Sequence, residues 1–348
     1  MSHLQADIEE LISDYIKNSE EDVDRSELRE RILETTFPEI CKSVLDSLLK
    51  TAPGMLRDRR ADELQFREKN YKKWSTAFDL TEMYLKMSQE FGQAMSDELR
   101  NAAEESNDYR FVAIRSLHAR ALLVANEIVC LMKGGFADGA LGRWRTLHEI
   151  SVVAKLLSQE NIVISERYLK HRNARMYKDL KSYKEHQEEA KLVPLNEKTL
   201  QDAEQVYNYV LEKYGDEMKY DWGWASPALG KRKPNFCQIE EYVGMARWRP
   251  RYKWSSEDTH GGYRPHMRML GTSEAQQPML LVGPSDSGLA DPGQMVTVSL
   301  DVVNAALYTL SPDIVDFVVY RKIMDWLLDQ ISLAFVKVHK RTNTEAKH

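Results

Sequence analysis

The sequence predicts an all-α protein: a helical bundle with a small β-hairpin insertion and a charged helical N-terminal region. Apolar residues recur every three or four positions along most of the chain, which is the period of a helix with one buried face. Glycine pairs, and Asp or Asn residues placed before apolar runs, separate these stretches as helix ends do. Of the 348 residues, 43% are hydrophobic and 29% charged, so the chain can bury a sizeable core.

The N-terminal region is expected over residues 1–72, where charge is dense. Apolar residues at helical spacing between Ile40 and Leu49 predict short amphipathic helices, and Ala52-Pro53-Gly54 predicts a break after them. The stretch from Leu56 to Trp74 is dense in charge, with 11 charged residues among 19. It predicts a solvated helix or linker, or alternatively a contact arm for a protein partner or a polyanion.

The helical-bundle core is expected over residues 73–342, followed by a flexible polar tail at 343–348. Its first helix is predicted at Ser75–Asn101, where aromatic and aliphatic residues share one face. A short β-hairpin is expected between His266 and Val282, pairing residues 266–270 with 279–282. Two final helices follow Asp291-Pro292-Gly293, with a break at Ser311-Pro312.

The most apolar part of the core is a predicted helical hairpin. Asp108 is suited to cap a helix that runs to Met132, and Lys133-Gly134-Gly135 ends it because glycine accepts a left-handed backbone. Asp138 is expected to cap the next helix, which continues through Leu157.

After the hairpin, a helix rich in Lys and Arg is predicted at Ile164–Glu189, and Asn196 precedes another that ends near Tyr214. On the Lys- and Arg-rich helix, Arg167, His171 and Arg175 share one stripe. This stripe is either a solvated helix face or a set of phosphate-binding side chains.

Several protein classes are not supported by the sequence. The net charge of −6 argues against non-specific coating of nucleic acid, and three scattered cysteines argue against a disulfide framework. No phosphate-binding glycine loop, zinc-binding histidine pair or serine-hydrolase elbow occurs, so we expect no metal and no cofactor. The first residues lack signal-peptide features, and the apolar stretch Ala119–Met132 contains charged residues, so we expect a cytoplasmic protein without a membrane span.

Ionisable residues cluster in the predicted hairpin. Arg145, His148 and Glu149 lie on one face of its second helix, while Arg120 and Glu127 share a face of the first. Charges in a buried hairpin must be paired and hydrogen-bonded. They form either a structural salt-bridge network or a polar pocket whose Arg and His bind or cleave a phosphodiester.

A further pair, Arg143 and His148, has the Arg-x-x-x-x-His spacing of the ribonucleases of the higher-eukaryote and prokaryote nucleotide-binding (HEPN) superfamily. In that chemistry the Arg steadies phosphate charge and the His transfers a proton. On a continuous helix the two residues lie roughly 140° apart, so they converge only if the helix is irregular.

A late segment interleaves arginines with aromatic residues and contains Arg251, Trp254 and Ser255, followed by His260-Gly261-Gly262. Such a segment suits base stacking with phosphate contact, or equally a cation–π-stabilised core. His260 is a candidate for a site histidine or for a structural cap.

Together these motifs resemble a bacterial family catalogued as domain of unknown function 5677. The resemblance covers about residues 75–310 and rests on Gly-Gly-x3-Gly-Ala-x-x-Arg-x-Arg-Thr-Leu-His-Glu149, on Trp248-x-Pro-x-Tyr-x-Trp-Ser-Ser-x3-His260-x-Gly, and on Leu289-Ala-Asp-Pro-Gly293. That family is similar to HEPN-like all-α proteins, many of which are RNases in toxin–antitoxin and anti-phage systems. The resemblance points to Arg145 and Glu149 in the hairpin and to Trp254, Ser255 and His260 in the late motif.

The leading expectation is therefore an RNA-binding or RNA-cleaving protein, acting as a metal-independent ribonuclease effector in defence or a toxin system. Arg143 and Arg145 are expected to hold phosphate, His148 or His260 to move the proton, and Glu149 to orient the arginine. The alternative is a non-catalytic interaction or sensor protein that docks a partner through its N-terminal arm. A homodimer through the apolar helices suits both interpretations.

Overall fold

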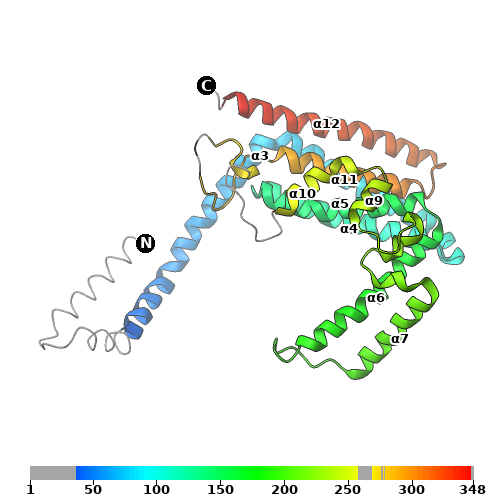
Figure 1. Cartoon of the computed structure of the whole chain (residues 1–348). Helices are drawn as coiled ribbons and strands as arrows, with labels where there is room; N and C mark the ends of the chain where they lie inside the picture. The colour runs from blue at the N-terminus through cyan, green and yellow to red at the C-terminus, as the bar shows by residue number, and fades with distance from the viewer. Residues whose placement is uncertain (1–36, 258–268, 276, 278, 346–348) are drawn as a thin grey trace, which may run out of the picture. The chain divides into compact units, whose positions relative to one another are not determined.

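The computed structural model describes residues 37–257, 269–275, 277 and 279–345. The chain divides into two compact units, one ending at Glu68 and the other starting at Lys69. The described residues form helices and contain no strand, as Figure 1 shows, so the all-α class is confirmed.

The α-helices are α3 (Phe37–Ser106), α4 (Tyr109–Lys133), α5 (Ala137–Gln159), α6 (Ile162–His186), α7 (Glu197–Tyr214), α8 (Ser226–Leu229), α9 (Phe236–Tyr242), α10 (Arg249–Glu257), α11 (Ala290–Tyr308) and α12 (Val315–Glu345). Short 3₁₀ helices are η2 (Asp216–Lys219), η3 (Gly223–Ala225), η4 (Ala246–Trp248) and η6 (Leu270–Thr272).

In the described part of the first unit the chain is one continuous helix, so the predicted break at Ala52-Pro53-Gly54 is wrong. Helix α3 passes through Pro53. A proline removes one backbone hydrogen bond from a helix, and here the flanking turns continue on both sides of it. The hydroxyl of Thr51 also donates to the carbonyls of Ser47 and Leu48, at 3.1 and 3.2 Å.

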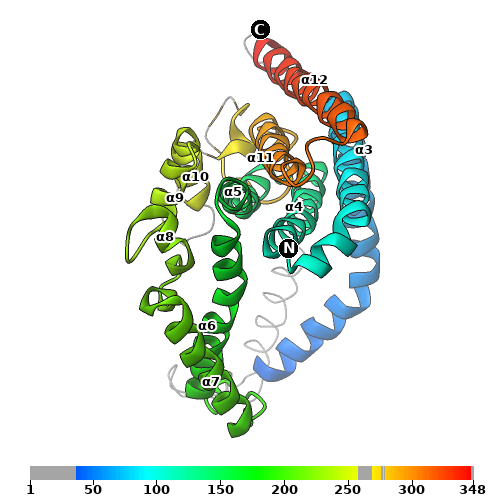
Figure 2. The ribbon, with the colours of Figure 1, turned by 90° about the vertical axis from the view of Figure 1, so that its right-hand side faces the viewer.

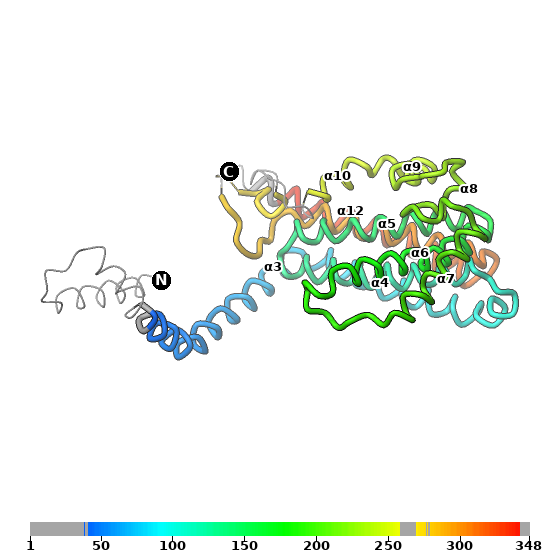
Figure 3. The backbone as a smooth tube through the Cα atoms, turned by 60° about the horizontal axis from the view of Figure 1, so that its bottom comes forward, coloured from blue at the N-terminus to red at the C-terminus, as the bar shows by residue number. Residues whose placement is uncertain are grey.

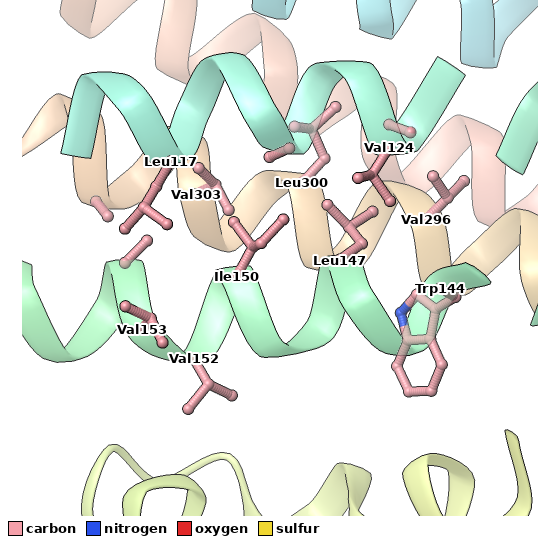
Figure 4. Close-up of a cluster of buried hydrophobic side chains, with 14 of the residues drawn as sticks. Leu117, Val124, Trp144, Leu147, Ile150, Val152, Val153, Val296, Leu300 and Val303 are labelled. Carbon is pink, nitrogen blue, oxygen red and sulfur yellow. The ribbon is translucent and has the colours of Figure 1, made fainter. Parts of the chain in front are cut away.

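The core of the second unit is built by α4, α5 and α11, which pack side by side (Figures 2 and 3). Figure 4 shows the contact between them, with Leu117 of α4, Ile150 of α5 and Val303 of α11 meeting in one layer. Helix α12 and the second half of α3 cover a further side, where the ring of Phe335 contacts Trp74 and Phe78. The apolar hairpin predicted from sequence is therefore the centre of the molecule's second unit.

Two glycines allow neighbouring helices to approach closely. A Cβ atom on Gly92 of α3 would lie 2.3 Å from the ring of His118 on α4. A Cβ atom on Gly293 of α11 would lie 2.3 Å from the ring of Phe335 on α12. Any side chain at these positions would force the paired helices apart.

Most predicted helix ends are confirmed. Asp108 accepts hydrogen bonds from the amides of Arg110 and Phe111, and Asn196 accepts one from the amide of Lys198. Helix α4 ends at Lys133 as predicted, with Gly135 at a φ of +81°. Helices α11 and α12 flank the predicted break at Ser311-Pro312, although α11 already begins at Ala290.

Asp138 does not cap α5, which corrects the sequence prediction. Helix α5 begins at Ala137 without a side-chain cap. The Asp138 carboxylate instead accepts hydrogen bonds from the amides of Leu270 and Gly271, at 2.8 and 2.9 Å. It therefore holds η6 against the start of α5.

The predicted β-hairpin is not found among the described residues. Residues 270–272 form the 3₁₀ helix η6, and residues 279–282 have no regular secondary structure. The remaining part of its first strand, residues 266–268, lies outside the described residues, as do residues 1–36 of the charged N-terminal region and 346–348 of the predicted tail.

A buried polar cluster joins α3, α4 and α11. His118 Nε2 lies 2.9 Å from the side-chain oxygen of Asn304, and the Asn304 amide donates to the hydroxyls of Tyr84 and Ser88 at 3.2 and 3.0 Å. Burial lowers the pKa of His118 from 6.5 to about 4. His118 is therefore neutral in the folded protein at neutral pH.

This shift predicts a loss of stability in mild acid. Unfolded chains take up the proton at pH 6.5 whereas the folded protein resists protonation until about pH 4. The free energy of unfolding should fall by about 3 kcal/mol from this group alone as the pH drops through that window, and should not change above it. Urea unfolding at pH 7, 6, 5 and 4 measures the change.

His118→Gln is the control, because glutamine keeps an amide donor and does not titrate. The difference in stability between wild type and this variant should shrink as the pH falls from 6.5 to 4. A constant difference across this range would show that His118 is not the titrating group.

Candidate functional site

A cleft of about 1220 Å³ opens in the second unit between α4, α5, α6 and the segment from Asp221 to Tyr252. Its walls combine aromatic, arginine and carboxylate side chains. The residues on which the site depends are Arg120, Arg145, Glu149, Tyr168, His171, Arg172, Arg175, Asp179, Tyr183, Asp221, Trp222, Trp224 and Tyr252. The cleft brings Arg145 and Glu149 of α5 together with His171 and Arg175 of α6.

One wall is a polar triplet of two charged residues and a tyrosine, made by two segments far apart in sequence. Arg145 Nε lies 3.4 Å from Glu149 Oε1, and the Arg145 guanidinium stacks over the Tyr252 ring at 4.8 Å from its centroid. The Tyr252 hydroxyl donates a hydrogen bond to Glu149. Burial, and then this hydrogen bond, raise the pKa of Tyr252 to about 12, so the phenol stays protonated at neutral pH.

Behind this wall lies a second polar group that solvent does not reach. His148 and Glu240 are both fully buried, and His148 Nε2 lies 2.8 Å from Glu240 Oε1. The other Glu240 oxygen accepts a hydrogen bond from Arg249. Aromatic rings of Trp144, Phe236 and Tyr252 surround the imidazole. His148 is thus a structural residue that does not line the cleft.

Arg143 and His148 do not converge. Helix α5 is regular over Ala137–Gln159, so the two residues point in different directions. Arg143 binds Glu127 on α4, and its Nη1 lies 3.3 Å from the Thr146 hydroxyl. The Arg-x-x-x-x-His pair therefore forms no joint site.

Helix α6 carries two kinds of polar residue, one that is buried in the fold and others that line the cleft. Arg167 is buried and donates hydrogen bonds to the carbonyls of Trp224, Tyr214 and Gly223 and to the carboxylate of Glu217. It holds the chain after α7 against α6 and does not line the cleft.

His171, one turn further on, lines the cleft. Its Nε2 lies 2.9 Å from the carbonyl of Tyr220. Because a carbonyl only accepts, Nε2 carries the proton and Nδ1 is the nitrogen that can accept one. Burial, and the nearby positive charge of Arg175 and Lys178, lower the pKa of His171, so the imidazole is neutral at neutral pH.

Three arginines on the cleft walls are exposed. Arg120 of α4 and Arg172 and Arg175 of α6 make no hydrogen bond or ion pair with any residue that the structure describes. The acids on the same walls are Glu149, which already holds Arg145 and Tyr252, and the exposed Asp179 and Asp221. An arginine that lacks a carboxylate partner keeps all its donors available for an anionic ligand.

Three of the predicted late-motif residues, Arg251, Trp254 and Ser255, do not line the cleft. Arg251 binds Asp291, which ties the late motif to the start of α11. Ser255 is buried and donates to the carbonyl of Tyr252 at 2.9 Å, and Trp254 packs against the hydrophobic core. His260 lies outside the described residues.

Several of the cleft residues were not expected from the sequence. Arg120 and Glu127 were expected either in a structural salt-bridge network or in a polar pocket, and Tyr252, Trp222 and Tyr168 were not selected. For Tyr252 a signal was present, because the residue lies within the same motif as Trp254. The aromatic residues of the cleft come from segments that only the fold brings together.

The described residues contain neither a metal-binding cluster nor a helix suited to span a membrane. No group of three or more His, Cys, Asp or Glu side chains is arranged to hold a metal ion. Among the helices in the described ranges, none has both the length and the apolar character needed to cross a membrane.

The fold and the site define an all-α protein with an arginine-lined aromatic cleft. Residues 111–277 match the model of a family of unknown function, DUF5677. The matched residues include the cleft walls. No curated protein and no solved structure gave a match.

Proposed function

We propose that the protein binds single-stranded RNA in the arginine-lined cleft. The observation that carries this proposal is the convergence of Arg120, Arg172 and Arg175, from two helices, on one cleft without protein partners for their guanidinium groups. Guanidinium groups bind phosphate oxygens in a bidentate way, and three of them suit the repeated charges of a nucleic-acid strand.

The aromatic walls supply surfaces for bases. Tyr168, Tyr183 and Trp222 line the cleft and are partly exposed, and Tyr168 meets the buried ring of Trp224 edge to face at 5.0 Å between ring centroids. Unpaired bases stack on such rings, which favours a single strand over a duplex. A volume of about 1220 Å³ exceeds the usual range of about 300–1,000 Å³ for small-ligand pockets. We infer that several nucleotides of one strand occupy the cleft.

The test is fluorescence anisotropy with a fluorescein-labelled, mixed-sequence RNA of 15 nucleotides, in EDTA. Replacing Arg120, Arg172 and Arg175 together with alanine should weaken binding about 100-fold, if each phosphate contact contributes about 1 kcal/mol. All three side chains are exposed and lack partners, so the free energy of unfolding should change by less than about 0.5 kcal/mol for each one.

Arg232→Ala is the matched control. Its side chain is 73% exposed, lies 3.6 Å from Asp216 and does not line the cleft. This variant should bind RNA as wild type does. If the control and the triple variant lost affinity equally, general surface charge rather than the cleft would explain binding.

Ribonuclease activity is a second candidate, favoured by the position of His171. A neutral imidazole whose Nδ1 is available, next to arginines that can hold a phosphate, is suited to accept the proton of a ribose 2′-hydroxyl. Attack of that oxygen on the neighbouring phosphate would break the bond to the 5′-oxygen, which takes up a proton from water, and leave a 2′,3′-cyclic phosphate. This chemistry is the kind expected of a toxin or an anti-phage effector.

Cleavage in EDTA, followed on a gel with end-group analysis, tests this candidate. Wild type should yield cyclic-phosphate ends, and His171→Asn should lose cleavage while retaining RNA affinity. RNA that is bound and remains intact in wild type would support a binding protein that does not cleave. Growth arrest on induction in bacteria, lost in the same variant, is the result expected of a toxin.

Docking of a protein partner is the remaining alternative. It is favoured by the exposure of Leu45, Leu48 and Leu49 on the part of α3 that lies in the first unit. A wild-type protein that bound no RNA in the anisotropy assay would favour this interaction function over the RNA proposal.

A further inference from the structure

Helix α12 has an exposed apolar stripe. Trp326 is 60% exposed and Leu333 63%, and Val315, Val319 and Ile323 are exposed as well. The opposite side of the helix is buried against α11 and α3 through Phe317, Met324, Leu327, Ile331 and Phe335. Figure 2 shows α12 at the edge of the second unit, beside α3 and α11. Contiguous apolar residues on a surface mark an interaction site more often than single ones do.

The spacing of this stripe is that of a coiled-coil seam. Val319, Trp326 and Leu333 are seven residues apart, and Ile323 follows Val319 by four positions and precedes Trp326 by three. A repeat of four and three residues keeps a seam facing one partner helix along its length. The continuation of the repeat falls on Gln330, a polar residue of the kind that fixes register in such seams.

Two opposite charges flank the seam. Lys322 and Asp329 are both exposed, and neither makes an ion pair with any residue in the described part of the chain. The Lys322 ammonium lies 5.6 Å from the centre of the Trp326 ring. The two residues are seven positions apart, so they occupy the same side of the seam one heptad from each other.

We infer that α12 is a homodimer interface in which it pairs with α12 of a second copy, antiparallel. In the proposed register, Ile323 of each copy lies opposite Trp326 of the other copy. Leu333 of each copy then lies beside the segment from Val315 to Val319 of the other copy. In this register Lys322 of each copy faces Asp329 of the other, which gives two ion pairs related by the twofold axis. A parallel pairing would instead place Lys322 beside Lys322 of the other copy, and Asp329 beside the other Asp329, so no opposite charges would meet at the same level.

This interface does not depend on the proposed function, because none of its residues lines the cleft. Sedimentation velocity over a protein concentration series tests it. Wild type should form a dimer, and Trp326→Glu and Leu333→Glu should sediment as monomers with unchanged circular dichroism. Leu123→Glu is the control: this α4 side chain is 61% exposed, and its variant should remain a dimer.

Charge variants identify the occupant of the face. Lys322→Asp alone and Asp329→Lys alone should each weaken the dimer at least 10-fold, because like charges then meet across the interface. An equimolar mixture of these two variants should form a heterodimer, since both cross-pairs become attractive, and the double variant should recover the homodimer. A wild-type monomer at all concentrations, a dimer that Leu123→Glu dissociates, or charge variants that do not rescue each other would overturn the proposal.

Discussion

Replacing Arg167 with alanine is expected to lower the free energy of unfolding by about 3 to 5 kcal/mol, because a buried, paired arginine is removed and its partners are left behind. Arg167 is only 5% exposed, and its guanidinium group donates to three carbonyls and to Glu217. Without these donors the carbonyls of Tyr214, Gly223 and Trp224 lose their side-chain partner in a dry environment. Urea unfolding at pH 7 measures the change.

Arg175→Ala, on the same helix, is the matched comparison. Its side chain is exposed and bonds to no residue that the structure describes, so the unfolding free energy should change by less than about 0.5 kcal/mol. Equal effects of the two substitutions would contradict the separate roles assigned to these arginines, one structural and one for binding.

The second large effect is expected at Glu240. Its fully buried carboxylate joins His148 to Arg249, so Glu240→Ala leaves a cationic group and an imidazole without their common partner. The free energy of unfolding should fall by about 3 to 5 kcal/mol. Glu240→Gln, which retains a hydrogen-bonding side chain without the charge, should lose less. Thermal or urea unfolding of the variants measures both values.

Glu241→Ala is the control for this prediction, because the neighbouring carboxylate is exposed and accepts only a weak bond, at 3.5 Å, from the Cys237 thiol. It should unfold as wild type does. RNA affinity should fall with Glu240→Ala, since Phe236 and Tyr252 pack on the His148 ring and also line the cleft. Wild-type stability in the Glu240→Ala variant would show that the buried network does not hold this wall.

The helices of the core follow from local signals in the sequence. Asp108 and Asn196 cap the helices they precede, because a cap depends on a few adjacent residues. Asp138 is different: the residues it binds, Leu270 and Gly271, are more than 130 positions away. Nothing near Asp138 in the sequence distinguishes a helix cap from a residue that holds a distant loop.

The site was harder to predict for the same reason. Periodicity places Arg167 and Arg175 on one stripe of α6, but the chain after α7 covers only the first of them. Likewise Arg120 and Glu127 share a helix face, yet Glu127 binds Arg143 and Arg120 lines the cleft. Burial of a charged residue is decided by which element packs over it, and helical spacing alone does not show this.

The salt dependence of RNA binding tests the cleft most directly. Each phosphate contact made by a single strand releases counterions and adds about 0.7 to the slope of log K against log salt concentration. Replacing Arg120, Arg172 and Arg175 together should therefore reduce the magnitude of that slope by about 2 relative to wild type and to Arg232→Ala. Equal slopes in all three proteins would contradict phosphate binding by these arginines.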